Sequence, residues 1–163
     1  ILFTDIRGFT AYSEKHTPDE VMDILNKILD YQVNIIKKYN GDIDKFIGDS
    51  IMVIFKGENK EIKALKTAYE ILKNYPFEEI KIGIGIASGK VIIGNIGGTG
   101  RKELATIGDI VNTASRLCGI ANKSEIVVSE ETYLKVKVAG FKGPEYVSLK
   151  GKTNPIPVYK MSV

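Results

Sequence analysis

The sequence predicts an α+β fold built on a ferredoxin-like β-α-β-β-α-β core, followed by further α/β elements at the C-terminal end. Two long segments carry apolar residues at helical spacing, short apolar runs with strand character lie between them, and glycine-containing turns separate neighbouring runs. The chain has 163 residues, enough to bury a core in one unit. We therefore expect a single domain over residues 1–163.

Composition excludes several classes of protein. The net charge is only +3 and the lysines are scattered, so we expect no nucleic-acid partner. A single cysteine, Cys118, excludes an intrachain disulfide. No apolar run reaches the roughly 18–20 residues of a membrane span, so a cytoplasmic domain is expected. Because the chain begins in a strand and without Met, we expect it to be part of a longer protein, which could be membrane-anchored.

The first strand is expected over residues 1–5, and a turn through Gly8 follows it. The first long helix is expected to begin after Thr17. This residue can cap the helix, Pro18 suits the first helical position, and Glu20 completes a capping box. Apolar residues then recur close to a 3.6 period, and Asn40-Gly41 ends the helix.

The centre of the sequence predicts a β-hairpin. Its first strand spans residues 41–47, with Ile43 and Ile47 as inward-facing side chains. In the second strand, apolar residues alternate with period two at Ile51, Val53 and Phe55, which suits a strand with one buried face. Gly48-Asp49 lies between the strands, where a two-residue loop favours a residue that tolerates positive φ.

Beyond the hairpin, apolar spacing over residues 62–72 predicts a second helix, which ends before Pro76. Residues 81–87 and 90–96 read as two strands joined by Ser88-Gly89, a second hairpin. A glycine-rich stretch, Gly94 to Gly100, comes next. It does not match a dinucleotide-binding fingerprint, and a mobile hairpin end is favoured over a phosphate-binding loop.

The remaining segments predict a third helix over Asp109 to Ala121 and a strand over Glu125 to Val128. Ser129 can cap a short fourth helix. The tail carries two prolines around a Val-Tyr pair, which is typical of an edge strand because proline cannot donate a hydrogen bond to a neighbour.

A few polar residues stand where a ligand could meet the strands. Asp5 lies at the end of the first expected strand, shortly before Gly8, and Asp49 follows Gly48 in the expected hairpin turn. They are either a carboxylate pair for Mg²⁺ or ordinary turn aspartates. Lys45 is either a ligand-contacting cation or a solvent-facing strand residue. Asn112 and Arg116 are four residues apart and share one face of the third helix, which could be solvated or could meet phosphate.

Four segments taken together resemble the class III nucleotidyl cyclase catalytic domain, and they follow the family's order and spacing across essentially the whole chain. They are Phe3-Thr4-Asp5-Ile6-Arg7-Gly8-Phe9-Thr10, Lys45-Phe46-Ile47-Gly48-Asp49, the run from Ile107 to Leu117 (IGDIVNTASRL), and Leu149-Lys150-Gly151. One segment alone would be a weak signal, but four in register are highly specific. The resemblance implies that the expected core belongs to a class III cyclase homology domain.

The resemblance also implies a set of site residues. Asp5 and Asp49, with Ile6 beside them, would hold two Mg²⁺ (or Mn²⁺) ions over a triphosphate, and the backbone of Phe9 and Thr10 would help to bind phosphate. Asn112 would orient the ribose and Arg116 would stabilise charge on the transferring phosphorus. Lys150 would bind the terminal phosphates. Arg101 lies near the sequence position at which some members of the family carry a further phosphate-contacting arginine.

The implied reaction is that of an adenylate cyclase in signal transduction: the ribose 3′-oxygen of ATP attacks the α-phosphorus, and cyclic AMP and pyrophosphate form. The family works as a head-to-tail homodimer with nucleotide sites at the interface, and sensor or regulatory domains are expected in the full-length protein. Lys45 would contact the base of the nucleotide in the other site, which it reaches from the partner subunit. It favours ATP, since guanylate cyclases of the family carry Glu there.

One position departs from the family pattern. The second base-selecting position is Ala105, which cannot accept a hydrogen bond from the adenine amino group. A lost neutral hydrogen bond is worth about 0.5–1.5 kcal/mol, which weakens the preference for ATP without reversing it. We expect Thr106, a backbone carbonyl or a water to substitute.

Two alternatives stay open on the sequence alone. One is a catalytically weak or inactive cyclase-like domain that binds nucleotide or regulates a partner, and the other is a guanylate cyclase of relaxed base specificity. A diguanylate cyclase is disfavoured, because the central hairpin lacks that family's Gly-Gly-Asp/Glu-Glu-Phe loop.

Overall fold

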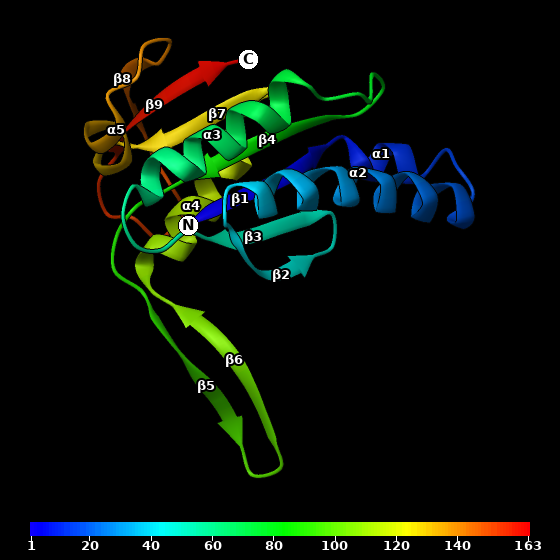
Figure 1. The fold of residues 1–163 in the computed structure, drawn as a ribbon, viewed down its shortest axis with the longest axis horizontal. Coiled ribbons are helices and arrows are strands. Elements are labelled where there is room, and N and C mark those ends of the chain that lie inside the picture. The colour runs from blue at the N-terminus through cyan, green and yellow to red at the C-terminus, as the bar shows by residue number, and fades with distance from the viewer.

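The computed structural model describes residues 1–163, with the side chain of Arg101 outside the described part. A large mixed sheet is covered by helices, and a two-stranded arm extends away from it (Figure 1). The elements, in chain order, are β1 (Leu2–Arg7), α1 (Phe9–Ser13), α2 (Pro18–Lys38), β2 (Asp42–Ile47), β3 (Ser50–Ile54), α3 (Lys60–Lys73), β4 (Lys81–Ile86), β5 (Ile92–Gly98), β6 (Arg101–Ile107), α4 (Asp109–Ile120), β7 (Glu125–Ser129), α5 (Glu130–Val136), β8 (Lys142–Val147) and β9 (Ile156–Ser162).

The seven-stranded sheet has the order β2-β3-β1-β4-β7-β9-β8. In its first four strands each strand is antiparallel to its neighbours, and with α2 and α3 these strands form the expected ferredoxin-like core. The expected C-terminal additions continue the same sheet, because β7 pairs parallel to β4 and β9 pairs antiparallel to β7. The predicted fold class is confirmed.

Two apolar clusters cover the two faces of this sheet. One includes residues of α2 and α3 and the side chains of Leu2 and Ile51, and the other lies under α4 and includes Phe3 and Met52. As a result, β3 is buried on both faces from Ile51 to Ile54, whereas the sequence predicted one buried face. Helices on both sides of a sheet produce such continuous apolar runs.

The central hairpin is confirmed. β2 and β3 pair antiparallel, with Ile47 opposite Ser50, and Gly48 at the turn has a φ of 60°. Ile43 packs against the core as expected, but Ile47 is 50% exposed and Phe46 is 52% exposed. The expectation of an inward-facing Ile47 was wrong: Ile47 is the last residue of β2, an edge strand whose last three residues are exposed.

The second predicted hairpin was wrong. β4 does not pair with β5, because β1 and β7 already occupy both of its edges. Instead β5 pairs with β6 over its whole length, from Ile92 opposite Ile107 to Gly98 opposite Arg101. The glycine-rich stretch therefore forms the end of a hairpin, as the favoured interpretation expected, and this hairpin is the arm of Figure 1.

The C-terminal strand was also misassigned. β9 lies between β7 and β8, so β8, which the sequence analysis did not identify, is the edge. Pro157 is nevertheless accommodated: it pairs with Tyr146 of β8, but the pairing with β7 ends one residue later, at Val158. Its missing N–H therefore interrupts no bond to a strand on that side.

The remaining helix predictions agree with the structure. Thr17 and Glu20 form the capping box of α2, with the Thr17 N–H 2.8 Å from Glu20 Oε2. Ser129 caps α5 through the N–H of Thr132. α4 begins at Asp109 and ends one residue before the predicted end.

Candidate functional site

Asp5 and Asp49 meet at one end of the large sheet. Asp5 lies on β1, and its Oδ1 accepts a hydrogen bond of 2.7 Å from the hydroxyl of Ser50, the first residue of β3. Asp49 lies in the β2–β3 turn, directly before Ser50. The backbone N–H groups of Ile6 and of Asp49 itself face its carboxylate and favour its charged form. The turn chemistry of Gly48-Asp49 thus brings the second carboxylate beside the first.

This arrangement raises the pKa of Asp49 above its usual value. Burial is the largest cause, and the negative charge of Asp5 is the second. The two backbone N–H groups and Arg7 act in the opposite direction but do not cancel these effects. A cation bound beside the two carboxylates would offset the cost of ionising Asp49.

The donor set fits Mg²⁺ or Mn²⁺ held jointly with a phosphate ligand. Both carboxylates offer hard oxygen ligands. The backbone of Ile6 faces Asp49 with its N–H group, which favours the charged form of that carboxylate. Among the residues that the structure describes, no group of three or more His, Cys, Asp or Glu side chains could hold a metal ion. Mg²⁺ commonly binds through one or two carboxylates plus substrate phosphates, so a pair is sufficient.

The sequence analysis missed Arg7. Its guanidinium lies 3.1 Å from Asp5 Oδ2 and also donates to the backbone carbonyl of Cys118, near the C-terminal end of α4. The side chain is 18% exposed. Asp5 and Arg7 are two residues apart on one strand and so point to the same face, and this period-two spacing was the signal that could have identified the pair.

Asn112 and Arg116 lie on the side of α4 that faces away from the sheet. The opposite side of α4 carries the buried residues Ala114, Leu117 and Cys118, which pack on the sheet. Asn112 is exposed and Arg116 is partly buried. The helical spacing therefore predicted their shared face correctly.

The loop between β8 and β9 lies against α4. A Cβ added to Gly151 would be 3.2 Å from Arg116 Nη2, and Leu149 is buried in the cluster under α4. Lys152 forms an ion pair with Asp109, the first residue of α4, while Lys150 is exposed. These contacts bring the predicted phosphate-binding Lys150 and Arg116 to one region of the molecule.

Lys45 and Thr106 come together through an acid that the sequence analysis did not single out. Thr106 Oγ1 donates a hydrogen bond of 2.6 Å to Asp44 Oδ1, and Lys45 Nζ lies 3.3 Å from Asp44 Oδ2. This contact joins β2 to the base of the arm. Ala105, the neighbour of Thr106, is 9% exposed.

Phe9 and Thr10 begin the short helix α1, where the sequence predicted only a turn. Gly8 precedes them with a φ of 81°. The first N–H groups of a helix have no acceptor within it, so they can bind an anion. Phe9 packs on the core and Thr10 is exposed.

The described contacts therefore divide the predicted site residues into three groups: Asp5 with Asp49, Arg116 with the β8–β9 loop, and Lys45 with Thr106. Within the part of the chain that the structure describes, no hydrogen bond or ion pair joins one group to another. The side chain of Arg101 lies outside the described residues.

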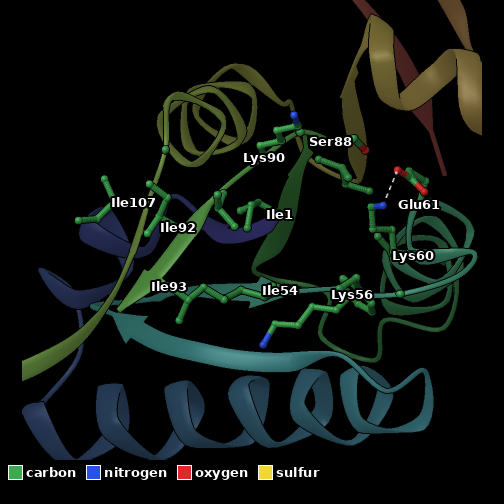
Figure 2. A pocket seen from close by; sticks show the side chains of 17 residues that line it. Ile1, Ile54, Lys56, Lys60, Glu61, Ser88, Lys90, Ile92, Ile93 and Ile107 are labelled. Carbon is green, nitrogen blue, oxygen red and sulfur yellow. Dashed lines mark ion pairs between the residues drawn. The ribbon is translucent and has the colours of Figure 1, made fainter. Parts of the chain in front are cut away.

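A pocket of about 800 Å³ lies elsewhere, at the opposite end of β1 from Asp5. Figure 2 shows Ile92, Ile93 and Ile107 at the base of the arm, together with Ile1 and Ile54 of the large sheet, around this pocket. Lys56, Lys60 and Lys90 also line it. None of the site residues predicted from the sequence belongs to its lining. This pocket thus does not coincide with the predicted site.

Comparison with known families identifies the chain. The model of the adenylate and guanylate cyclase catalytic domain matches residues 1–161. The chain belongs to this family. The resemblance stated from the four sequence segments is therefore confirmed, and the chain is a nucleotidyl cyclase catalytic domain.

Individual relatives include enzymes of both base specificities. The terminal-differentiation specific adenylate cyclase of Dictyostelium discoideum is 33% identical over 99% of this chain, which spans only 8% of that protein. The crystal structure of the adenylyl cyclase CyaB from P. aeruginosa has a TM-score of 0.88 and 32% identity, over 99% of this chain and 92% of that one.

The guanylyl cyclase Cya2 is nearly as similar in structure to this domain. Its TM-score is 0.86 with 28% identity, over 98% of this chain and 88% of that one. Overall similarity therefore does not distinguish ATP from GTP as the substrate. Among the described residues, no helix of this cyclase domain is both long enough and apolar enough to cross a membrane.

Proposed function

We propose that this domain is an adenylate cyclase, which converts ATP to 3′,5′-cyclic AMP and pyrophosphate in signal transduction. The observation that carries the proposal is the pairing of Asp5 with Asp49 at the end of β1, in a chain of the cyclase family. A divalent cation would relieve the cost that burial and Asp5 impose on the charge of Asp49.

In the proposed reaction, the bond from the ribose 3′-oxygen to the α-phosphorus forms and the bond to the bridging oxygen of pyrophosphate breaks. The 3′-hydroxyl proton passes to water. Two divalent ions, when bound, supply the Lewis acidity that activates the 3′-hydroxyl and neutralises the leaving charge. Asp5 and Asp49 would hold them, with Ile6 contributing its backbone.

The cationic and amide side chains would then act by position. Arg116, whose guanidinium fork suits phosphate oxygens, would stabilise the charge on the transferring phosphorus. Asn112, on the same face of α4, would orient the ribose. Lys150 would bind the terminal phosphates, with help from the first backbone N–H groups of α1 at Phe9 and Thr10.

The proposed preference for ATP rests on Lys45. An ammonium can donate to the N1 acceptor of adenine, whereas guanine carries a hydrogen at N1. The side chain of Lys45 is 43% exposed, so it is accessible to a ligand. Ala105 would offer the base no hydrogen-bonding side chain.

We also propose that the active unit is a head-to-tail homodimer. The division of the predicted site residues into three groups, with no hydrogen bond or ion pair described between them, supports this, because a second chain could bring complementary groups together. Apolar side chains left exposed by the single chain also support an interface: Ile92 (74%), Leu104 (62%), Ile107 (53%) and Phe46 (52%). The expected sensor or regulatory domains stay a prediction.

The test is product formation by the purified protein. ATP or GTP is supplied with Mg²⁺ or Mn²⁺ at several protein concentrations, and cyclic AMP and cyclic GMP are quantified. The proposal expects cyclic AMP in excess, reduced at least about a hundredfold by Asp49→Asn, since this substitution removes a metal-binding carboxylate. Asp42→Asn, at the exposed far end of β2, is the matched control.

Each other outcome favours a stated alternative. Cyclic GMP in excess would make the domain a guanylate cyclase. Nucleotide binding without any cyclic product, at every protein concentration, would favour the inactive regulatory domain. Equal loss of activity in Asp42→Asn would mean that the effect of Asp49→Asn is not specific to the carboxylate pair.

A further inference from the structure

Asp44 occupies an unusual position on β2. The register between β2 and β3 shifts between Ile43 and Lys45, so Asp44 lies on a β-bulge with no partner in the ladder. Bulges redirect side chains, and that of Asp44 is only 6% exposed. A buried carboxylate is costly unless it is paired, so its partners indicate why it is there.

Those partners are two residues of the proposed base-binding region. Asp44 Oδ1 accepts a 2.6 Å hydrogen bond from the hydroxyl of Thr106. Asp44 Oδ2 is buried, and no group that the structure describes donates a well-oriented hydrogen bond to it, but Lys45 Nζ lies 3.3 Å away. One carboxylate thus faces both a hydroxyl and an ammonium.

The hydrogen bond determines what Thr106 can offer a ligand. A hydroxyl has one hydrogen to donate and two lone pairs to accept with. Since the hydrogen of Thr106 Oγ1 is directed to Asp44, only the lone pairs remain available. Thr106 and Ala105 point to opposite faces of β6, and Thr106 is the one that reaches the neighbour of Lys45.

We propose that Asp44 is a specificity-determining positioning residue, which makes Thr106 a hydrogen-bond acceptor beside the Lys45 donor, so that the pair reads the Watson–Crick edge of adenine. Adenine offers a donor at its 6-amino group and an acceptor at N1, the complement of this pair. Guanine offers an acceptor at O6 and a donor at N1, which opposes both groups. The acceptor lacking at Ala105 is thereby supplied one residue later.

This inference rests on the proposed function, because it assumes that the base lies near Lys45. It concerns recognition of the base and not the chemical step. Binding of a nucleotide that cannot cyclise therefore tests it separately from catalysis. The suitable probes are 3′-deoxy-ATP and 3′-deoxy-GTP, which lack the attacking hydroxyl.

The experiment measures the ratio of the two dissociation constants by calorimetry for the wild type, Asp44→Ala and Thr106→Val. In the wild type we expect 3′-deoxy-ATP to bind more tightly. Thr106→Val should reduce that preference about three- to tenfold, the range for one neutral hydrogen bond. Asp44→Ala should reduce it at least as much, because the hydroxyl can then rotate and donate to guanine O6.

Two controls separate recognition of the base from damage to the fold. Thr106→Ser keeps the hydroxyl and should retain the preference for 3′-deoxy-ATP. Asp42→Asn, which changes an exposed residue of the same strand, should also retain the preference for 3′-deoxy-ATP. If turnover is detectable, kcat/KM for the triphosphate of purine riboside, which lacks the 6-amino group, should be equal in the wild type and Thr106→Val.

The outcomes are distinct. Unchanged base preference in folded Asp44→Ala and Thr106→Val proteins would overturn the inference, even in an active adenylate cyclase. A preference lost in both variants and retained in Thr106→Ser would support it, even if no variant forms cyclic product and the proposed function fails.

Discussion

At the scale of single residues, the carboxylate pair has a cost to the fold. The pKa of Asp49 is raised by burial and by Asp5, so in the absence of metal the ionised form of Asp49 destabilises the folded protein. This penalty is present above the folded-state pKa of Asp49 and disappears as the pH falls below the usual carboxylate value. Sites built to bind charge commonly carry such a penalty.

We therefore expect Asp49→Asn to melt at a higher temperature than the wild type at pH 7 in the presence of a chelator. The gain should shrink as the pH falls through the raised pKa of Asp49 and towards the usual carboxylate range, because wild-type Asp49 takes up a proton there. Thermal unfolding followed by circular dichroism measures both effects. A variant that melts lower than the wild type at pH 7 would contradict this account.

At the scale of elements, α4 is packed unusually close to β4. A Cβ added at Gly85 would lie 2.1 Å from the backbone nitrogen of Cys118 and 2.5 Å from the carbonyl oxygen of Ala114. Backbone atoms cannot rotate away as a side chain can. The position of α4, and with it that of Asn112 and Arg116, thus depends on the absence of a side chain at Gly85.

Gly85→Ala should therefore displace α4 and destabilise the protein by about 1–3 kcal/mol. It should also lower cyclase activity more than this loss of stability explains. Gly119→Ala is the matched control, since Gly119 lies on α4 with open space around it. It should stabilise the helix by about 0.5 kcal/mol. The free energy of unfolding in urea and the cyclase activity are measured on the same samples of both variants. Equal effects of the two substitutions would refute the claim that the position of α4 depends on Gly85.

Elements with a local signal were predictable from the sequence. The cap at Thr17, the spacing along α2 and the Gly48-Asp49 turn each specify structure within a few residues. The pairing of β5 with β6 and the internal position of β9 were not predictable, because strand pairing depends on which edges distant segments leave free. The same limit applied to the site: Asp5 and Asp49 carry family motifs, whereas the bulge at Asp44 and the contact of Arg7 with Cys118 exist only in three dimensions.

At the scale of the whole molecule, the proposed head-to-tail dimer predicts complementation. If Asp49 from one chain works with Arg116 of another, then Asp49→Asn and Arg116→Ala proteins should each be inactive alone. In an equal mixture about half of the dimers are mixed, each with one intact site, so about a quarter of wild-type activity should return. Titration of one variant into the other, with cyclic AMP as the readout, measures this. A mixture that stays inactive while the chains exchange would exclude a site shared between two chains.

The arm formed by β5 and β6 has a consequence for how the molecule becomes ordered. An isolated two-stranded hairpin is marginally stable in water. This one pairs with no other strand that the structure describes, and it exposes Ile92 and Leu104. Its backbone amides should therefore exchange with deuterium quickly at low protein concentration. They should become protected as concentration rises, while the amides of β1 and β4 stay protected throughout. Folding of the arm and recognition of a second chain would then be a single cooperative event.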